Sequence, residues 1–573
     1  MTEKLPQEKH RNRFNYFIIA FISLAIVFIA ADAYRNSPGY GFVYDDYELV
    51  VRNADIRDLS SAGIAGMFFS RDYVNFLPLR MLSYAVDYHY WGLNPKGYHI
   101  TNVIMHAVNC LLVFMLALYL IKHVARREWD DRIMIGAAGI AALFFAAHPI
   151  HVEAVAWVSG RKEMLYSFFI LLGMLFYVRS RTIGATERAN GGFAVVWLCF
   201  IAAMMSKGTA LVFPFVLVFF DIMFPEIAKR TPLVRRLQEH AAFFMIMVVF
   251  LAIDAKSAYR GQMFTAPFGG GALSHILTIA KVVPFYLKQI FWPANLSAIY
   301  IVPVAHSLFE PAVLISLAVW AGLGALFIFG RRRWPLIVFG AGFFLIALGP
   351  TLNVVPFGTF AADRYAYLPL FGLCLAAGDC VGLAKQRGAA IRILAGLVII
   401  AAFSACFYIT EIKNADWKDS ITFWTATART APDSTIAAAG LGAAYMEKGE
   451  FAKALPELER ALKLDPDSPT AYSALALYYL SFNDTKKAES VIREGLKRMP
   501  GNLALLYHSG IVHYKEGDYE RAAWIFAGVY ATKPNYLNVG NKMNETIGKL
   551  KKTMTPSEFE EFSKSFEAVI MRQ

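Results

Sequence analysis

Two neighbouring carboxylates are the first residues in this sequence with an evident capacity for chemistry. Asp45 and Asp46 lie between Tyr44 and Tyr47, shortly after an apolar segment. A carboxylate beside a membrane suits a general base that removes a hydroxyl proton, while its neighbour positions a metal or a substrate. A solvated acidic turn would show the same residues. The pair alone therefore leaves a catalytic and a surface role open, and leaves open which of the two is the base.

A second polar group combines histidines with a glutamate. His148, His151 and Glu153 fall within six residues at the end of an apolar segment, and Gly160-Arg161-Lys-Glu163 follows. Polar groups at such positions are costly unless they are used. Their spacing differs from the HExxH pattern of zinc proteases, so we expect no metal site. Helix-end capping and interfacial anchoring are the alternative interpretation.

Isolated cations form a third group. Arg364 lies in Asp363-Arg-Tyr-Ala-Tyr-Leu-Pro369, and Lys207 lies between Ser206 and Gly208. An arginine can bind a phosphate through two parallel hydrogen bonds, although it can equally extend to the membrane interface. A carboxylate base together with a cationic phosphate site is what glycosyl transfer from a lipid-phosphate sugar requires. The phosphate leaves without a general acid.

Long apolar segments must position these residues. The chain has 573 residues, of which 57% are hydrophobic and 17% charged, whereas soluble proteins carry about 25% charged residues. A spanning helix needs about 20 mostly apolar residues. The sequence therefore predicts an all-α polytopic membrane domain over residues 1–412. Its expected spans, about 11, are 14–33, 100–121, 133–147, 163–179, 193–206, 208–223, 240–254, 309–330, 334–350, 363–384 and 391–411.

Basic residues predict the orientation of these spans. Lys and Arg cluster in short loops, and with these spans every cluster falls on the side of the N-terminus. That side is predicted to be cytoplasmic, because Lys and Arg resist translocation. An odd number of spans then places the C-terminal part outside. The net charge of +12 arises from these loops, so we expect a lipid bilayer as a partner and no nucleic acid.

Residues 273–292 are also apolar enough to span the membrane. Counting them would put Arg331–Arg333 on the outer side. We therefore expect an interfacial or partly inserted helix there.

An internal repeat begins after residue 413. Small and aromatic residues recur at the 34-residue spacing of tetratricopeptide repeats, in which a small residue lets two helices pack closely. The sequence predicts a repeat domain over residues 413–573, with repeats near 435–468, 469–502 and 503–536. The residues of the first two copies that match are Leu441, Gly442, Tyr445, Ala454 and Pro466, and Leu475, Ala476, Tyr479, Ala488 and Pro500.

These features together resemble a known family. The chain resembles the transmembrane and tetratricopeptide-repeat protein O-mannosyltransferases, which are GT-C class glycosyltransferases. The similar stretches occur in the order of the family, followed by the repeats, so the resemblance covers most of the chain. They are Phe42-Val-Tyr-Asp-Asp46, Leu93-Asn-Pro-Lys-Gly-Tyr-His-Ile-Thr-Asn102 with His106, His148-Pro-Ile-His-Val-Glu-Ala-Val155 with Gly160-Arg161, Ser206-Lys207, and Asp363–Pro369.

The resemblance implies inverting transfer of a sugar, usually mannose, from a polyprenyl phosphate to protein Ser or Thr, within a GT-C-like fold. It implies that Asp45 or Asp46 takes the hydroxyl proton. Two departures leave the sugar open: Leu77-Pro-Leu79 stands for Arg-Pro-Leu, with Arg80 following, and the acid after Gly-Arg is displaced to Glu163. The resemblance assigns the donor phosphate to Arg364, Arg161 and Lys207, and the sugar or acceptor site to His99, His106, His148, His151 and Glu153.

Three functional hypotheses follow. The first is a glycosyltransferase that modifies proteins on the outer face, with the repeats engaging the protein acceptor. The second is an enzyme of the same class that acts on a lipid-linked glycan or a cell-wall polymer. The third is a non-catalytic membrane scaffold built around the repeats. We favour the first, with no metal or other cofactor. The short loops and compact tail suggest a bacterial inner membrane, with a cytoplasmic N-terminus and a periplasmic repeat domain.

Overall fold

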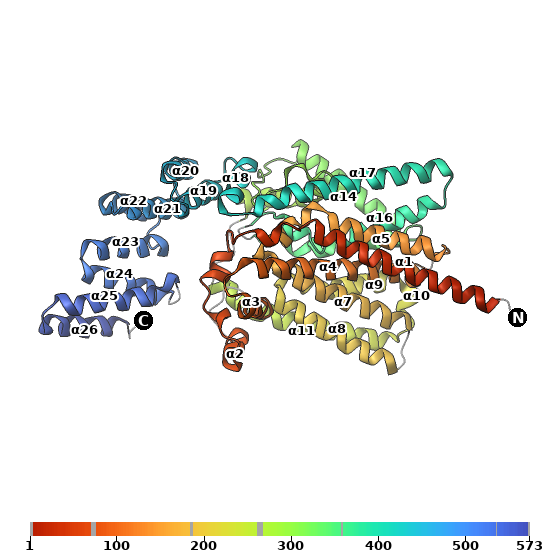
Figure 1. Ribbon diagram of the computed structural model, residues 1–573, viewed down its shortest axis with the longest axis horizontal. Helices are drawn as coiled ribbons and strands as arrows, with labels where there is room; N and C mark the ends of the chain where they lie inside the picture. Colours follow the sequence, from red (N-terminus) through yellow and green to blue (C-terminus); the bar gives the residue numbers. More distant parts are fainter. Residues whose placement is uncertain are drawn as a thin grey trace. The chain divides into compact units, whose positions relative to one another are not determined.

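The computed structural model is mainly helical in the residues that it describes, which are 4–69, 76–125, 127–183, 187–260, 267–356, 359–533 and 536–570. No β-strand occurs among them. The chain divides into two compact units, residues 1–422 and residues 423–573. Figure 1 draws the first unit in red to blue-green and the second in blue.

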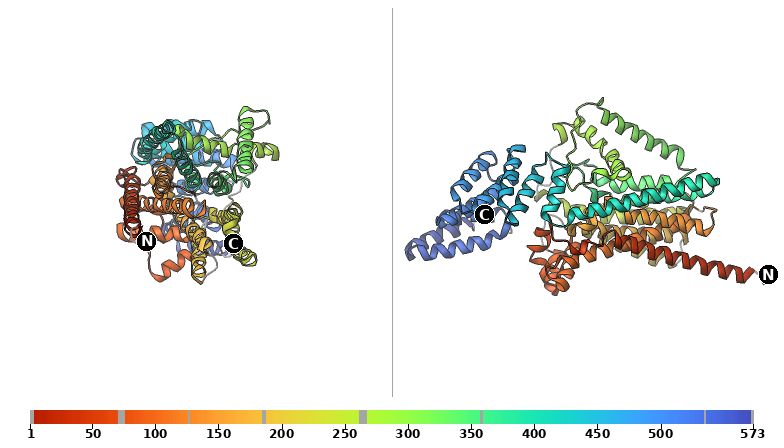
Figure 2. Two further views of the ribbon diagram at one scale, coloured as in Figure 1. Left: turned by 90° about the vertical axis from the view of Figure 1, so that its right-hand side faces the viewer. Right: turned by 45° about the horizontal axis from the view of Figure 1, so that its top comes forward.

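The first unit is a bundle of long apolar helices. Figures 1 and 2 show α1, α4, α5, α7 and α17 lying roughly parallel to one another. The helices of this unit are α1 (Lys4–Asp32), α2 (Ser61–Phe69), α3 (Pro78–Trp91), α4 (Pro95–Tyr119), α5 (Asp131–Ala147), α6 (Val152–Ala156), α7 (Arg161–Ile183), α8 (Glu187–Ser206), α9 (Phe213–Met223), α10 (Pro225–Ala228), α11 (Leu233–Arg260), α12 (Ala272–Ala280), α13 (Val282–Phe291), α14 (Pro311–Gly330), α15 (Pro335–Leu348), α16 (Leu370–Lys385) and α17 (Ala389–Asn414).

The length and composition of these helices make the chain an integral, multi-pass membrane protein. In the described part of the chain, 6 helices are long and apolar enough to cross a bilayer, and α5 with the bent continuation after it makes up to 7. Three shorter apolar helices lie at 193–206, 208–223 and 335–351. The remaining predicted span, 363–384, begins with a short 3-10 helix, Asp363–Ala366, and its α-helix starts only at Leu370. A total of 11 spans therefore stays a prediction.

The apolar segment at 273–292 is divided into two helices. α12 has 9 residues and α13 has 10, and they meet at Lys281. Neither reaches the length of about 20 residues that a span requires. The interfacial placement predicted for this segment remains a prediction.

Glycines let two of the bundle helices approach closely. A Cβ added to Gly372 of α16 would lie 2.1 Å from the carbonyl oxygen of Gly340 on α15, and a Cβ on Gly340 would lie 2.2 Å from that of Gly372. Small residues at such crossings are the usual means by which membrane helices gain packing contact. This crossing supports the start of α16, directly after the segment that carries Arg364.

The second unit contains the predicted repeats. Caps at Ser434, Ser468 and Asn502 begin the first helix of each pair, and each side chain accepts a backbone N–H of the following turn. Because these caps recur at the repeat period, each helix starts at the same place in its copy. Residues 534–535, at the end of the third predicted repeat, lie outside the described residues. The helices are α18 (Ser420–Thr430), which spans the boundary between the units, α19 (Thr435–Glu447), α20 (Phe451–Leu464), α21 (Pro469–Ser481), α22 (Thr485–Arg498), α23 (Leu503–Glu516) and α24 (Tyr519–Thr532).

A further helix pair follows the repeats. α25 (Val539–Thr553) and α26 (Pro556–Ile570) pack their buried faces against α24, with Phe562 and Phe566 in contact with Trp524. This pair was not predicted from the sequence, because its residues do not continue the small-residue pattern of the repeats. It covers the apolar end that a repeat array would otherwise expose.

Candidate active site

The two adjacent aspartates point into different surroundings. Asp46 is completely buried. Its Oδ1 accepts the backbone N–H of Ser159 at 2.8 Å and the Ser159 hydroxyl, and its Oδ2 accepts the N–H of Val43 at 3.1 Å. Burial raises its pKa to about 7, against the opposing effect of these hydrogen bonds. Asp46 is therefore occupied in tying the first loop to the turn before α7.

Asp45 is only half-buried, and its carboxylate makes no hydrogen bond or ion pair with any other described residue. Burial raises its pKa, while the positive charges of Lys162, Arg364 and Arg80 lower it. A carboxylate that is free of hydrogen-bond donors but close to cations can accept a proton from a substrate. Of the predicted pair, Asp45 is the one with that freedom.

Tyr44, the residue directly before the two aspartates, has an unusual backbone conformation. Tyr44 has φ +54°, in the left-handed region that bulky residues rarely adopt. Its ring stacks on that of Trp157 at 5.7 Å, and Trp157 stacks on Trp417 at 5.7 Å. Strained residues of this kind cluster at functional sites, where the surrounding contacts hold them. The stacking on Trp157 is one of the contacts that hold Tyr44 in this conformation.

Arg364 and Glu153 form a buried ion pair beside this aromatic stack. One Glu153 oxygen pairs with the guanidinium Nη1, and the other accepts the backbone N–H of Arg364 at 2.8 Å. The guanidinium lies over the rings of Trp157, at 5.5 Å, and Tyr365, at 5.0 Å. Its Nε is buried without an acceptor among the described residues. Glu153 therefore holds Arg364 by one edge and leaves further donors for an anion.

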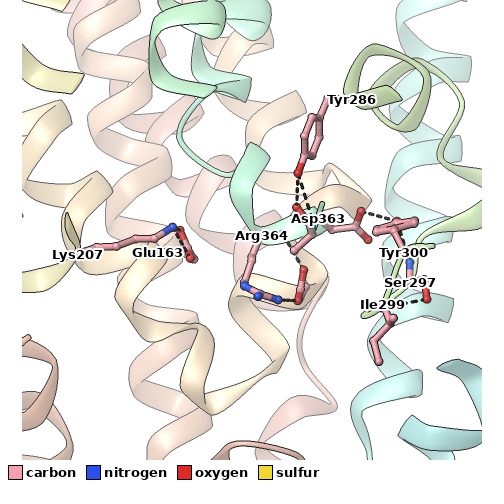
Figure 3. Close-up of polar contacts among 10 residues, drawn as sticks. Glu163, Lys207, Tyr286, Ser297, Ile299, Tyr300, Asp363 and Arg364 are labelled. Atoms are coloured by element: carbon pink, nitrogen blue, oxygen red, sulfur yellow. Dashed lines mark hydrogen bonds and ion pairs between the residues drawn. The ribbon is translucent and has the colours of Figure 1, made fainter. Parts of the chain in front are cut away.

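Lys207 forms a buried ion pair with Glu163, the acid that follows the Gly160-Arg161 motif. Its ammonium lies 2.7 Å from one Glu163 oxygen and 2.6 Å from the other, as Figure 3 shows. The same ammonium lies 5.1 Å from the ring centres of Tyr166 and Tyr365. Because Tyr365 also carries Arg364 on its ring, it links the two ion pairs. Burial lowers the pKa of Lys207, and Glu163 opposes that shift.

The segment that carries Arg364 is held by two tyrosines. The Tyr286 hydroxyl donates to the carbonyl of Ala362 at 3.0 Å and accepts its N–H at 3.1 Å. The Tyr300 hydroxyl donates to Asp363 at 2.6 Å. Figure 3 shows both tyrosines on the side of this segment away from Lys207. Burial raises the pKa of Asp363 well above its usual range.

Arg161 lies in a different environment from the one predicted for a phosphate ligand. It is fully buried and forms an ion pair with Asp87. Its Nε donates to Asn102 at 2.8 Å, and Nη2 donates to the Tyr98 carbonyl at 2.8 Å. Asn102 in turn donates to the carbonyl of Trp157 at 2.9 Å. Arg161 therefore supports the backbone that presents Trp157, and its donors are engaged by Asp87, Asn102 and backbone carbonyls.

Steric crowding explains why a glycine precedes Arg161. A Cβ on Gly160 would lie 2.4 Å from the Ala154 carbonyl oxygen and 2.8 Å from that of Glu153. The Gly-Arg motif therefore reflects a close backbone approach that brings the start of α7 against α6, the helix carrying Glu153.

The side chains of the four predicted histidines are buried between the helices of the bundle. His106 bonds through Nδ1 to the Tyr367 hydroxyl at 2.9 Å and through Nε2 to the Ala146 carbonyl at 3.1 Å. His148 bonds to the Ile290 carbonyl at 3.0 Å and accepts the N–H of Ile150, which is a capping role. His151 is fully buried against Tyr367, and His99 lies 3.4 Å from the Gly41 carbonyl. Neither His106 nor His148 has a free ring nitrogen for a sugar. The sugar role stays a prediction for all four.

Lys162 is the main site residue for which the sequence predicted no role. Its ammonium lies 5.9 Å from the Trp157 ring, and it forms no hydrogen bond or ion pair within the described parts of the chain. Its position after Gly160-Arg161 was visible in the sequence, but its neighbours were not. No group of three His, Cys, Asp or Glu side chains at metal-binding distances occurs among the described residues.

Comparisons with known proteins agree with the two-part organisation. A model described as "TPR repeat" matches residues 442–481, and one described as "Tetratricopeptide repeat" matches residues 473–536. Protein O-mannosyl-transferase TMTC3 of Mus musculus is 25% identical over 519 residues, which cover 83% of this chain and 54% of the relative. Protein O-mannosyl-transferase F38B6.6 of Caenorhabditis elegans is 23% identical, covering 81% of this chain and 65% of the relative.

The family resemblance is confirmed by these relatives, and it extends across both units. A shorter match to Tmtc1 of Drosophila melanogaster reaches 33% identity over 187 residues, or 31% of this chain and 20% of the relative. The chain spans about half the length of the curated TMTC3 proteins, 54% for that of the mouse. Among solved structures, ArnT from Cupriavidus metallidurans bound to undecaprenyl phosphate is 14% identical, with a TM-score of 0.39, over 83% of this chain and 79% of that one.

Proposed function

We propose that this chain is a membrane glycosyltransferase that moves a sugar, mannose by resemblance to its relatives, from a polyprenyl phosphate to Ser or Thr of a protein. The observation that carries the proposal is the carboxylate of Asp45, which has no hydrogen-bond or ion-pair partner among the described residues and is under the influence of the positive charges of Lys162 and Arg364. Residues 1–412 would form the GT-C-like catalytic domain, and residues 413–573 would engage the protein acceptor.

The charge of the site favours a phosphate-bearing donor. Lys162, Arg364 and Arg80 place positive charge around Asp45, and Glu48 adds a further negative charge. Glu153 pairs with one nitrogen of the Arg364 guanidinium, and Lys162 has no ion-pair partner within the described residues. A phosphodiester with a single negative charge can therefore pair with these two cations.

The reaction would be a single displacement with inversion. The acceptor hydroxyl oxygen attacks the anomeric carbon and forms the new C–O bond, while the bond from that carbon to the phosphate oxygen breaks. The hydroxyl proton goes to Asp45, which acts as a general base. The bonding electrons leave with the phosphate, whose developing charge is stabilised by Arg364 and Lys162.

Three other predicted residues, Glu153, Lys207 and Arg161, have supporting roles in this mechanism. Glu153 orients Arg364, and Lys207 with Glu163 holds the Tyr365 ring beneath the guanidinium. Arg161 is better suited to positioning Trp157 than to contacting the donor, because its contacts are internal. No metal enters these steps. We further propose that the site faces the periplasm of a bacterial inner membrane, with the N-terminus in the cytoplasm.

The proposal is tested by transfer from radiolabelled polyprenyl-phosphate mannose to a Ser/Thr-rich peptide, using the purified full chain in detergent. Asp45→Asn keeps the size of the side chain and removes the base, so transfer should fall by roughly 100-fold or more. Glu48→Gln is the matched control. Glu48 is an exposed carboxylate of the same loop, 60% exposed and paired only with the exposed Arg52 among the described residues.

Wild-type activity that survives in Glu48→Gln and collapses in Asp45→Asn supports the mechanism. Equal rates for wild type and Asp45→Asn would overturn it. The second hypothesis, a lipid-linked or polymeric glycan acceptor, is distinguished in the same assay. Label that appears on an added lipid-linked glycan and not on the peptide would favour that alternative.

A further inference from the structure

A second candidate binding site lies at the other end of the bundle. A cavity of about 370 Å³ opens between α8 and α11. Arg161 and Arg181 occupy the two ends of α7, which separates them by about 30 Å along the helix axis. Arg181 pairs with Glu239 of the cavity wall at 2.7 Å. The cavity is therefore at the membrane face opposite Asp45. Its lining residues are Phe193, Trp197, Arg235, Gln238, Glu239 and Ala242.

The polar groups of this cavity are arranged to receive an anion. Both oxygens of Glu239 are already in use, one by Arg181 and one by the Nε of Arg235 at 3.1 Å. The carboxylate is thus neutralised and is not available for a cationic ligand. The indole N–H of Trp197 is buried and has no acceptor among the described residues. A buried donor without an acceptor is costly, and an anionic oxygen in the cavity would satisfy it.

An apolar track leads from the cavity along the membrane-facing side of α11. Met245 and Val249 follow Ala242 at helical spacing, and they are 66% and 54% exposed. On the other wall, Phe193 and Trp197 contact each other edge to face at 6.4 Å. An anion site that continues into an exposed apolar stripe has the two parts of a phospholipid, a charged head group and an acyl chain.

We propose that this cavity binds the head group of an anionic glycerophospholipid. Arg235 and the Trp197 indole donate to its phosphate, and one acyl chain lies along Met245 and Val249. Basic pockets between membrane helices are established sites for anionic lipid head groups. The site is separate from the proposed sugar transfer and does not depend on it.

The test follows the thermal stability of the purified full chain in a neutral detergent during titration with dioctanoyl-phosphatidylglycerol. Phosphatidylcholine of the same chain length and inorganic phosphate are titrated in parallel. Phosphatidylglycerol should raise the midpoint temperature saturably, and the other two should not. Trp197→Phe keeps an aromatic ring and removes the donor, so the apparent affinity should fall by roughly tenfold. Arg235→Gln should weaken it at least as much.

Arg236→Gln is the control. It removes the same charge from the next position of α11, and Arg236 does not line the cavity. It should retain the wild-type affinity. Stabilisation by inorganic phosphate alone would assign the site to a free anion, and equal stabilisation by phosphatidylcholine would show that charge is not recognised. Either result overturns the proposal, as does an equal loss in Arg236→Gln. If Arg235→Gln does not fold, Trp197→Phe still decides the outcome.

Discussion

Removing Asp46 should affect the fold before it affects the chemistry. Asp46→Ala would leave three buried donors without their acceptor, namely the N–H and hydroxyl of Ser159 and the N–H of Val43. Each buried donor left unpaired costs about 1–3 kcal/mol, so the total is on the order of several kcal/mol. Asp45→Asn loses no hydrogen bond within the described chain and should change stability by about 0.5 kcal/mol or less.

The pH dependence gives this prediction a second measurable sign. Because burial raises the pKa of Asp46 to about 7 from 3.8, the folded state binds more protons than the unfolded state between these values. Stability should therefore fall as pH rises from about 4 to about 7, by up to about 1.4 kcal/mol per pH unit from this group. Asp46→Asn cannot ionise, so its midpoint temperature should improve relative to wild type over the same range.

The assay combines thermal unfolding between pH 4.5 and 8 with the sugar-transfer measurement on the same preparations. Asp45→Asn should keep the wild-type midpoint and lose transfer, whereas Asp46→Ala should lose both. The reasoning is refuted if Asp46→Ala is as stable as wild type. It is also refuted if the difference between Asp46→Asn and wild type does not change with pH.

Three further predictions concern neighbouring features. Lys207→Met should destabilise the fold by about 3–5 kcal/mol because it leaves a buried charge on Glu163, and Lys207→Met combined with Glu163→Gln should recover much of this loss in thermal unfolding. Arg364→Lys keeps the charge and loses the planar fork, so kcat/KM for the lipid donor should fall by roughly tenfold or more, and an unchanged value would exclude donor contact. Gly372→Ala forces apart the crossing at Gly340, and it should lower the midpoint temperature, while Gly322→Ala, an exposed control within α14 with open space around its Cβ, should not.

The three cations near the site have different roles in the proposed mechanism, because their hydrogen-bond partners differ. Three cations near the site, Arg161, Lys207 and Arg364, are each paired with a carboxylate. The Nε of Arg364 is a buried donor without an acceptor in the described chain. The donors of Arg161, in contrast, bind Asp87, Asn102 and a backbone carbonyl. Only the former arrangement leaves a guanidinium edge for an incoming phosphate.

The sequence by itself determined the features that depend on local pattern. Apolar runs identify an integral membrane protein because a bilayer demands a continuous stretch of such residues. The repeat spacing identified the helix pairs of the second unit, because each copy must pack on the next through the same small residues. The sequence also identified Asp45 with Asp46 and the stretch around Arg364 as candidate functional residues, because polar groups next to a membrane are costly unless they are used.

Only the tertiary structure decided which of these residues are free to act. Asp46 is held by Ser159, which is 113 residues away in the chain, and Arg364 is held by Glu153 at a separation of 211. The histidines likewise meet backbone carbonyls and Tyr367 from distant segments. Residue type sets what a side chain can bind, but burial and long-range partners set what remains available. Those are properties of the packed helices and not of any local stretch of sequence.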